Sequence, residues 1–180
     1  MDFVNKNWLL KASDLIKGPE LGRGSFGVVY YGTFHGQEVA IKQIATSASS
    51  KDKQMATMML KREVKALSRC RHKNIVQLIG ACSDPPMLVL AYAAKGTLRD
   101  LLCLDNPLLP SRTMELIQGI CSGMTMLHSQ NVLHLDLKPE NVLIGADGTP
   151  LVADFGLAIA MSTTLTSGAR STSGGRGTMQ

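Results

Sequence analysis

The chain has 180 residues, of which 44% are hydrophobic and 18% are charged, and its formal net charge is +5. This length suits one ordinary domain or two small lobes, and the composition excludes wholesale disorder. The basic balance is compatible with a nucleic acid, an acidic lipid or a polyanionic nucleotide as partner and does not choose among them. Because the lysines and arginines are spread along the sequence, we interpret most of them as solvated surface charge.

The first predicted elements are three strands within residues 21–44. The β-branched and aromatic run 28–31 and the run 38–42 flank a turn at His35 and Gly36. Runs of this kind separated by turn residues predict antiparallel pairing. We therefore expect a three-stranded antiparallel meander whose first turn is rich in glycine.

Residues 53–69 predict a helix after the meander. Residues four positions apart lie on the same side of a helix, so one predicted face combines apolar side chains with a single carboxylate. The residues of this face are Met55, Met59, Glu63 and Leu67, widened by Leu60 and Val64.

Two short strands and two helices are predicted next. Strand-like runs span residues 75–81 and 87–92, and Thr97 with Asp100 three residues later resembles a capping box that begins a helix. A longer helix is predicted over residues 111–128. Its apolar side consists of Met114, Ile117, Cys121 and Met124.

The last part of the chain predicts a loop, a hairpin and a polar tail. Residues 134–141 form the loop, and two apolar pairs flank the turn sequence 146–148, which is typical of a hairpin. Residues 162–180 contain nine Ser or Thr and no acidic residue, which predicts a flexible loop or tail. The predicted fold class is α+β, with a β-rich N-terminal lobe followed by a mostly helical part.

The four cysteines predict free thiols rather than a zinc site. None belongs to a C-x-x-C pair, and none lies near a histidine at the spacing of zinc ligands. Two disulfides are the alternative that an even count allows, but free thiols in a reducing compartment are favoured. The residues concerned are Cys70, Cys82, Cys103 and Cys121.

The sequence contains no recognisable targeting or membrane segment. Its first residues lack the basic start and apolar core of a signal peptide. No apolar run approaches the roughly 18 residues that a membrane helix needs. We therefore expect an intracellular, cytoplasmic protein.

A glycine-rich loop is the first candidate for chemistry. Residues 22–27 match G-x-G-x-x-G through Gly22, Gly24 and Gly27, and glycines allow a backbone to approach a phosphate closely. A helix would have to follow this loop in a dinucleotide-binding fold, whereas a β-branched strand follows here. The pattern therefore argues against a dinucleotide site, and by itself it fits a tight turn equally well.

A lysine and a glutamate form the second candidate pair. Residues 39–42 match V-A-I-K, and Lys42 follows the glycine-rich loop at a distance that allows it to pair with phosphates as a point charge. Glu63 interrupts an apolar helix face, and a carboxylate on a buried face is costly unless it is paired. Lys42 is its obvious partner, and the alternative is that Glu63 lies at the rim of the face in water.

The strongest signal lies in residues 134–141, HLDLKPEN, and in the later sequence 154–156, DFG. Asp136 can orient a hydroxyl and accept its proton, while Asn141 and Asp154 can supply oxygen ligands to magnesium. Each short motif could occur by chance. The order of the motifs indicates a phosphotransfer site: a glycine-rich loop, a lysine, a glutamate, a catalytic loop and a metal-binding aspartate follow one another along the chain.

With these motifs in place, the chain resembles a eukaryotic-type protein kinase over nearly its whole length. Residues 20–32, 71–76 and 96–98 are similar to the tyrosine-kinase-like group, and Lys138 resembles the serine/threonine pattern. The resemblance implies a two-lobe fold, with an N-terminal extension over 1–14, an N-lobe over 15–92 and a partial C-lobe over 93–180.

The resemblance also implies how ATP and Mg²⁺ would be held. The adenine would lie among apolar side chains beside a hinge that includes Tyr92 and Ala93, with Leu90 at the rear of the pocket. The loop residues Gly22, Gly24, Ser25 and Gly27 would approach the phosphates, and the apolar contacts would come from Val29, Ala40 and Leu143. A stack of apolar side chains would consist of Leu67, Leu78, His134 and Phe155, and core packing alone is the other interpretation of these residues.

The implied reaction is transfer of the γ-phosphate of ATP to a Ser or Thr hydroxyl of a protein substrate. Asp154 and Asn141 would bind magnesium, and Lys42, held by Glu63, would position the phosphates. Asp136 would align the hydroxyl and Lys138 would steady the γ-phosphate. A protein substrate is therefore the expected partner, with no nucleic acid and an oligomeric state that the sequence leaves open.

Two departures from the family pattern affect this expectation. Leu135 stands where an arginine is usual, and Ile159 lies near the usual place of a second basic residue. We therefore expect that phosphorylation within residues 163–172 does not switch the protein through an arginine pocket.

The second departure is that no Ala-Pro-Glu motif or further helices follow residue 177. We therefore expect a truncated domain with partly uncovered apolar faces on the helices at 97–104 and 111–128. The alternative function is a kinase-like module that binds nucleotide or a partner without turnover.

Overall fold

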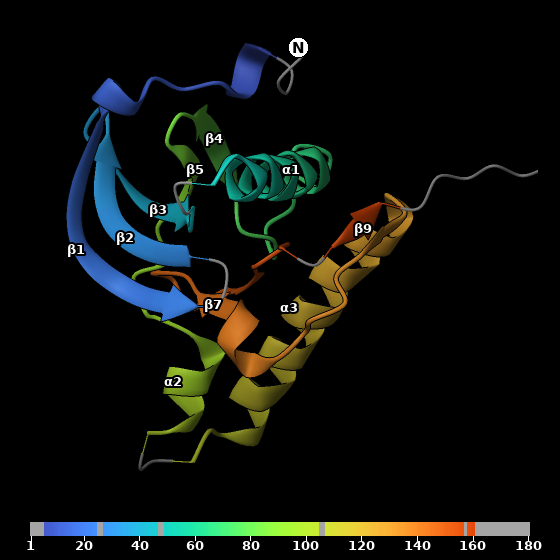
Figure 1. Cartoon of the computed structure of the whole chain (residues 1–180). Coiled ribbons are helices and arrows are strands. Elements are labelled where there is room, and N and C mark those ends of the chain that lie inside the picture. Colours follow the sequence, from blue (N-terminus) through green and yellow to red (C-terminus); the bar gives the residue numbers. More distant parts are fainter. Residues whose placement is uncertain (1–5, 25–26, 47–48, 105–106, 157, 161–180) are drawn as a thin grey trace, which may run out of the picture.

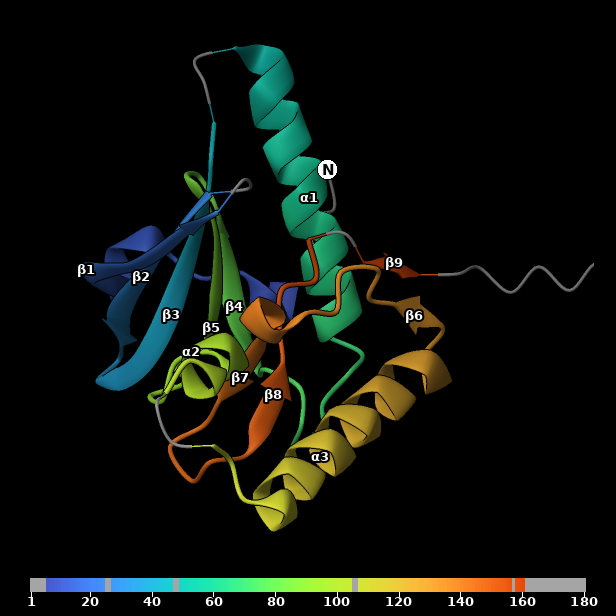
Figure 2. The same cartoon turned by 90° about the horizontal axis from the view of Figure 1, so that it is seen from below.

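A computed structural model describes residues 6–24, 27–46, 49–104, 107–156 and 158–160. Figure 1 shows a curved sheet with a helix beside it, and a second, mostly helical part below them. Figure 2 shows the same arrangement from below, where the long helix of the second part lies beside the short strand β8 (Pro150–Val152).

The sheet has five antiparallel strands in the order β1-β2-β3-β5-β4. The predicted meander is confirmed, and its β2–β3 turn at His35 and Gly36 has positive φ at both residues. This conformation matches the twist of paired strands and suits glycine at the second position. The strands are β1 Leu15–Gly24, β2 Gly27–Phe34, β3 Gln37–Ile44, β4 Leu78–Ser83 and β5 Pro86–Ala91.

Helix α1 (Ser50–Leu67) packs against β4 and β5. Glu63 and Leu67 are buried as predicted, but Met55 is 66% exposed, so the predicted face is wrong at its N-terminal end. A repeat of four drifts by about 40° per step around a helix of 3.6 residues per turn. The buried face instead follows mixed three- and four-residue spacing through Ala56, Leu60, Glu63, Val64 and Leu67.

The second part contains the helices α2 and α3, one small hairpin and one further pair of short strands. The capping box of Thr97 and Asp100 at the start of α2 is confirmed, as is the hairpin formed by β7 and β8. Strands β6 and β9 form the other pair. The elements are α2 Leu98–Leu102, α3 Pro110–Ser129, β6 Val132–Leu133, β7 Val142–Ile144, β8 Pro150–Val152 and β9 Ile159–Ala160, with a 3₁₀ turn at Pro139–Asn141.

The predicted apolar side of α3 is confirmed only at Met124, which is partly buried against the main core cluster. Met114, Ile117 and Cys121 are exposed, whereas the buried residues are Leu116, Gly123 and Leu127. The reason is a close contact made through glycine, because a Cβ at Gly123 would lie 2.6 Å from the carbonyl oxygen of Asn74. Hydrophobicity alone does not identify the buried face, since the contact depends on small residues. The expected uncovered apolar faces are confirmed on α3 and on the α2 segment, where Leu102 and Leu104 are exposed.

The segment before β4 joins the two parts. Residues 75–81 were expected to form one strand, but β4 begins at Leu78 and Val76 donates its N–H to the Val152 carbonyl at 2.9 Å. The Val152 N–H in turn donates to the Asn74 carbonyl. This pairing with β8 replaces pairing in the large sheet, and one apolar cluster continues from α1 through Val76 to Val152 and Phe155.

The N-terminal segment covers the edge of the large sheet. It forms 3₁₀ turns at η1 (Lys6–Trp8) and η2 (Ala12–Asp14), and the Leu10 N–H donates to the Ala81 carbonyl of β4 at 2.9 Å. A Cβ at Gly80 would lie 2.5 Å from Leu10 Cγ, so this close approach requires glycine.

The four cysteines are free, as the sequence predicts. Among the described residues, no helix has the length and apolar character that crossing a bilayer demands.

Candidate active site

Lys42 and Glu63 form a buried ion pair between β3 and α1. The Lys42 Nζ donates to the two carboxylate oxygens of Glu63 at 3.0 and 3.1 Å, and Glu63 is 2% exposed. Burial raises the pKa of the Glu63 carboxyl, and the Lys42 ammonium opposes that shift. Burial by itself lowers the pKa of Lys42, but Glu63 and Asp154 outweigh it, so the net direction is upward and Lys42 stays protonated. The predicted pairing is present, and its alternative, a water-exposed Glu63, is wrong.

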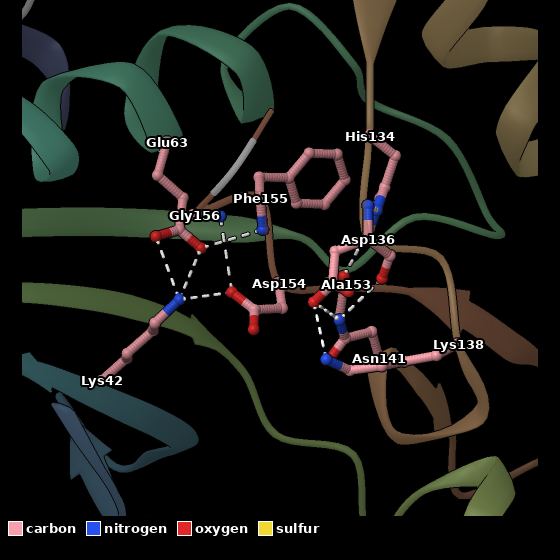
Figure 3. A network of polar contacts seen from close by, with 10 residues as sticks. All are labelled: Lys42, Glu63, His134, Asp136, Lys138, Asn141, Ala153, Asp154, Phe155 and Gly156. Atoms are coloured by element: carbon pink, nitrogen blue, oxygen red, sulfur yellow. Dashed lines mark hydrogen bonds and ion pairs between the residues drawn. The ribbon is translucent and has the colours of Figure 1, made fainter. Parts of the chain in front are cut away.

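Asp154 joins this pair from a distant part of the chain. Its Oδ1 accepts from Lys42 Nζ at 2.7 Å, while the Phe155 N–H donates to Glu63 Oε1 at 3.2 Å. Figure 3 shows Lys42 pointing at both carboxylates. Asp154 has φ of 59°, a left-handed conformation that aims its carboxylate toward Lys42 while the next N–H reaches Glu63. One ammonium therefore faces two carboxylates, and the group has excess negative charge.

The catalytic-loop candidate is held by hydrogen bonds from within its own segment. Asn141 Nδ2 donates to the Asp136 carbonyl at 2.8 Å and to Asp136 Oδ2 at 2.9 Å, and Lys138 Nζ donates to the same Oδ2 at 2.7 Å. His134 lies beneath the loop, where its Nδ1 accepts from the Asp136 N–H and its Nε2 donates to the Ala153 carbonyl. The buried imidazole thus ties the loop to the residue that precedes Asp154 (Figure 3).

The charge state of Asp136 follows from these contacts. The hydrogen bond from Lys138 is the main reason that the pKa of Asp136 lies below its usual value, and Asn141 contributes in the same direction. The same contact raises the pKa of Lys138. Asp136 is therefore an ionised, partly exposed carboxylate that can accept a proton.

The three glycines of the loop between β1 and β2 differ in what the fold requires. Gly27 has φ of 147°, and a Cβ there would lie 2.1 Å from the Gln43 carbonyl oxygen, so the fold itself demands glycine. Gly22 and Gly24 have open space where a Cβ would stand. Packing does not explain these two glycines, whereas close approach of a ligand to the backbone does.

The candidate adenine residues belong to one apolar cluster. Ala40 and Leu90 are opposite each other on β3 and β5 and are buried in the main core cluster. Val29 and Leu143 are partly buried and pack against the same cluster from β2 and β7. After β5, Tyr92 is half-buried and makes an edge contact with Tyr31, and Ala93 is buried.

The donor set near Asp154 fits a hard cation such as magnesium. The Oδ2 of Asp154 and the Oδ1 of Asn141 have no hydrogen-bond partner among the described residues, so each side chain offers an oxygen. Within the same part of the chain, no group of three or more His, Cys, Asp or Glu side chains forms a metal-binding cluster. Two protein oxygens are nevertheless enough for magnesium, which is usually held by one or two side chains together with substrate phosphates and water.

The model of the protein kinase domain family matches residues 15–177. The chain belongs to the protein kinase family. The match covers the sheet, α1 and both candidate loops, and the two-lobe expectation agrees with the five-stranded sheet followed by helices.

Three relatives illustrate the range of this kinase family. The chain is 37% identical over 163 residues to "Probable serine/threonine-protein kinase drkD" of Dictyostelium discoideum, covering 87% of this chain and 12% of that protein. It is 36% identical over 156 residues to "Serine/threonine-protein kinase STY46" of Arabidopsis thaliana, covering 84% and 26%. It is 38% identical over 149 residues to "Inactive tyrosine-protein kinase kin-32" of Caenorhabditis elegans, covering 78% and 17%. The chain thus spans about a quarter or less of the length of these relatives.

The stack of side chains expected from the kinase resemblance is present. Leu67, Leu78 and Phe155 are buried in one cluster, and the Phe155 ring lies 5.2 Å from the His134 ring, centroid to centroid. The stack links α1, β4 and both candidate loops.

Sequence patterns did not indicate several contacts of this kinase site. One is the direct ion pair of Lys42 with Asp154, and another is the hydrogen bond from the Phe155 N–H to Glu63. Both join residues about a hundred positions apart, and the second uses a backbone group, so no local pattern signals them. Ser25 and residues 163–172 lie outside the described residues, so the expectations about them stay predictions. Leu135 has φ of 64° and is exposed beside Asp136.

Proposed function

We propose that this kinase domain transfers the γ-phosphate of ATP to Ser or Thr hydroxyls of proteins, with Mg²⁺ as cofactor. The observation that carries the proposal is the presence of two networks of ion pairs and hydrogen bonds. One consists of Lys42, Glu63 and Asp154, and the other of Asp136, Asn141 and Lys138. Phosphoryl transfer needs positioning and charge stabilisation more than covalent chemistry, and this arrangement supplies both.

ATP would be bound by groups from several strands of the sheet and from β7. Lys42 is protonated and fixed by Glu63, so it can hold phosphate oxygens without reorganising. Gly22 and Gly24 leave room for phosphate at the backbone. The adenine would pack between Val29, Ala40 and Leu143, with Leu90 behind it and Tyr92 and Ala93 at the hinge.

Asp154 and Asn141 would hold Mg²⁺ through their oxygens. When bound, the ion supplies positive charge that neutralises the phosphates. Before ATP binds, Lys42 balances only one of the two carboxylates that it contacts, so the residual negative charge favours a divalent cation.

Asp136 would orient the acceptor hydroxyl and accept its proton. Its lowered pKa keeps it ionised, and Lys138 stands at 2.7 Å from its Oδ2, where it can also contact the transferred phosphate. The lysine two residues after Asp136 and the serine/threonine kinases among the relatives support Ser or Thr as acceptor.

A module that binds without turnover is the second candidate function. Exposed Leu109, Met114 and Ile117 at the start of α3 leave an apolar face uncovered, and one relative is named an inactive kinase. Turnover distinguishes the two candidates.

The test is phosphate transfer from γ-labelled ATP to casein in the presence of Mg²⁺, followed by phosphoamino-acid analysis. We expect labelled serine or threonine. We expect the activity of the Asp154→Asn variant to be at least about a hundredfold lower, because the variant lacks the carboxylate that would bind the Mg²⁺ ion at the phosphates. The matched control is Asp147→Asn, the same chemical change in the exposed β7–β8 turn, which should keep the activity. If the wild-type chain binds ATP but shows no transfer under any of these conditions, the binding module is the correct function.

The glycine-rich loop offers a second, internally controlled prediction. Gly24→Ala places a methyl group in open space within the proposed phosphate site, so stability should be unchanged while the KM for ATP rises roughly tenfold, which is about 1.4 kcal/mol of binding. Gly27→Ala places it against the Gln43 carbonyl at a strained φ, and should lower the free energy of unfolding by about 1–3 kcal/mol. Urea unfolding and ATP titration of both variants check this. Equal losses of stability would show that Gly24 is only a structural turn residue.

A further inference from the structure

A groove of about 710 Å³ lies outside the phosphotransfer site, where the N-terminal segment meets the end of α1 and the start of β4. Its walls include the half-buried Trp8, which belongs to η1. Buried Leu67 and Leu78 and half-buried Ile79 contribute apolar surface to its floor. A volume of this size is in the range of known ligand sites, which are mostly apolar with a few polar groups at fixed places.

The rim of this groove is basic. Arg71 and Lys73 line it and are exposed, and no lining residue is a carboxylate. Among the described residues, neither of the two forms an ion pair. Positive charge that no carboxylate in the described part of the chain pairs with is therefore concentrated at the edge of an apolar hollow.

The positive charge extends from the groove along α1. Six of the residues 61–73 are Lys or Arg, and the one acidic residue among them, Glu63, is buried and paired with Lys42. Arg62 and Lys65 are exposed on α1 at i, i+3 spacing, and Arg69 is exposed in the turn that follows the end of the helix at Leu67. The basic residues are denser here than elsewhere in the sequence, and the one acidic residue among them is buried.

We propose that this groove binds an acidic peptide segment of another protein, with a large apolar side chain on the floor and carboxylates at Arg71 and Lys73. The choice of an acidic peptide over other ligands rests on two features together, the apolar floor and the unpaired basic rim. A bilayer surface is too flat to enter a hollow between Trp8 and the loop after α1. A nucleic acid would satisfy the rim but would leave the apolar floor without a partner. An extended peptide with apolar side chains flanked on both sides by acidic ones complements both.

Trp8 makes the test possible without a label, because it is the single tryptophan of the chain and stands in the groove wall. The probe is the synthetic peptide EEDLLED, titrated into the full chain while the emission of Trp8 is followed, with KKNLLKN as the comparison peptide. We expect a saturable change with the acidic peptide and none with the basic one. Anionic phospholipid vesicles and a single-stranded oligonucleotide are titrated in parallel.

The variants are Arg71→Glu/Lys73→Glu at the rim and Lys51→Glu/Lys53→Glu at the start of α1. Both double variants replace two exposed basic residues and change the net charge equally. The second pair, however, lies about 25 Å from the C-terminal end of α1, where the groove is. The rim variant should weaken EEDLLED binding by at least about tenfold, and the control by less than about threefold. If the rim variant does not fold by circular dichroism, Arg71→Gln/Lys73→Gln takes its place, with Lys51→Gln/Lys53→Gln as its control.

Three results would overturn the proposal. The first is the absence of saturable binding by EEDLLED, and the second is an equal loss in the rim and control variants, which would mean attraction by net charge alone. The third is tighter binding of the vesicles or the oligonucleotide at the same rim residues. All readouts are binding measurements, so they are independent of whether the domain transfers phosphate.

Discussion

Replacing Asp136 by asparagine is expected to reduce the rate of phosphate transfer by about 10²- to 10⁴-fold, the range that a positioned general base contributes. The variant keeps the shape and the oxygen atom that can accept from Asn141, but it cannot take up the proton of the acceptor hydroxyl. The bond from Lys138 holds the pKa of Asp136 below the usual value, so the carboxylate is ionised and can accept a hydrogen bond from the hydroxyl. ATP binding should change little, since Lys42 and Asp154 are untouched.

The measurement is kcat for casein phosphorylation beside the dissociation constant for ATP from equilibrium dialysis. Asp100→Asn is a useful contrast, because Asp100 accepts bonds from Thr97 in the α2 capping box and should affect stability without affecting kcat. A variant at Asp136 that kept more than about a tenth of the activity would remove this residue from the proposed mechanism.

Replacing Lys42 by methionine is expected to damage both stability and activity. The substitution leaves the Glu63 carboxylate buried, with only the Phe155 N–H to stabilise it. Breaking a buried ion pair by removing one partner costs about 3–5 kcal/mol. The phosphates also lose their positioning cation, so transfer should fall below detection.

A double variant separates the two effects. In Lys42→Met/Glu63→Gln the unpaired buried charge is gone, and the amide can still accept from the Phe155 N–H. We expect urea unfolding to show that most of the lost stability returns, because the penalty lies in the unpaired carboxylate rather than in the missing pair. Activity should stay absent. If the double variant is as unstable as the single one, Lys42 contributes to the fold through packing and not through its pairing with Glu63.

Several features of this protein were predictable from the sequence because they depend on neighbours in the chain. The β2–β3 turn needs residues that tolerate positive φ at positions 35 and 36, and the α2 capping box needs Thr97 and Asp100 three residues apart. Both patterns are local, so they can be recognised without knowledge of the fold. The order of the motifs likewise indicated the family, which the match over residues 15–177 shows.

The tertiary structure alone decided which surfaces are buried. Periodicity identified α1 and α3 as helices, but Met55 and Ile117 are exposed, because α1 contacts the sheet, and α3 contacts Asn74, through other faces. Val76 pairs with Val152 and not within the large sheet. Which face of a helix is buried depends on the element that packs against it, and here that element comes from a distant part of the sequence.

The same division holds for the site. The sequence by itself determined which side chains are proposed to carry the chemistry, since Lys42, Asp136, Asn141 and Asp154 stand in recognisable local motifs. Only the fold decided that Lys42 meets Asp154 across 112 positions, and that Arg71 and Lys73 are exposed beside a groove while Glu63 is buried. Charges act through space, and the energy of a pair depends on separation and burial, which only the folded chain defines.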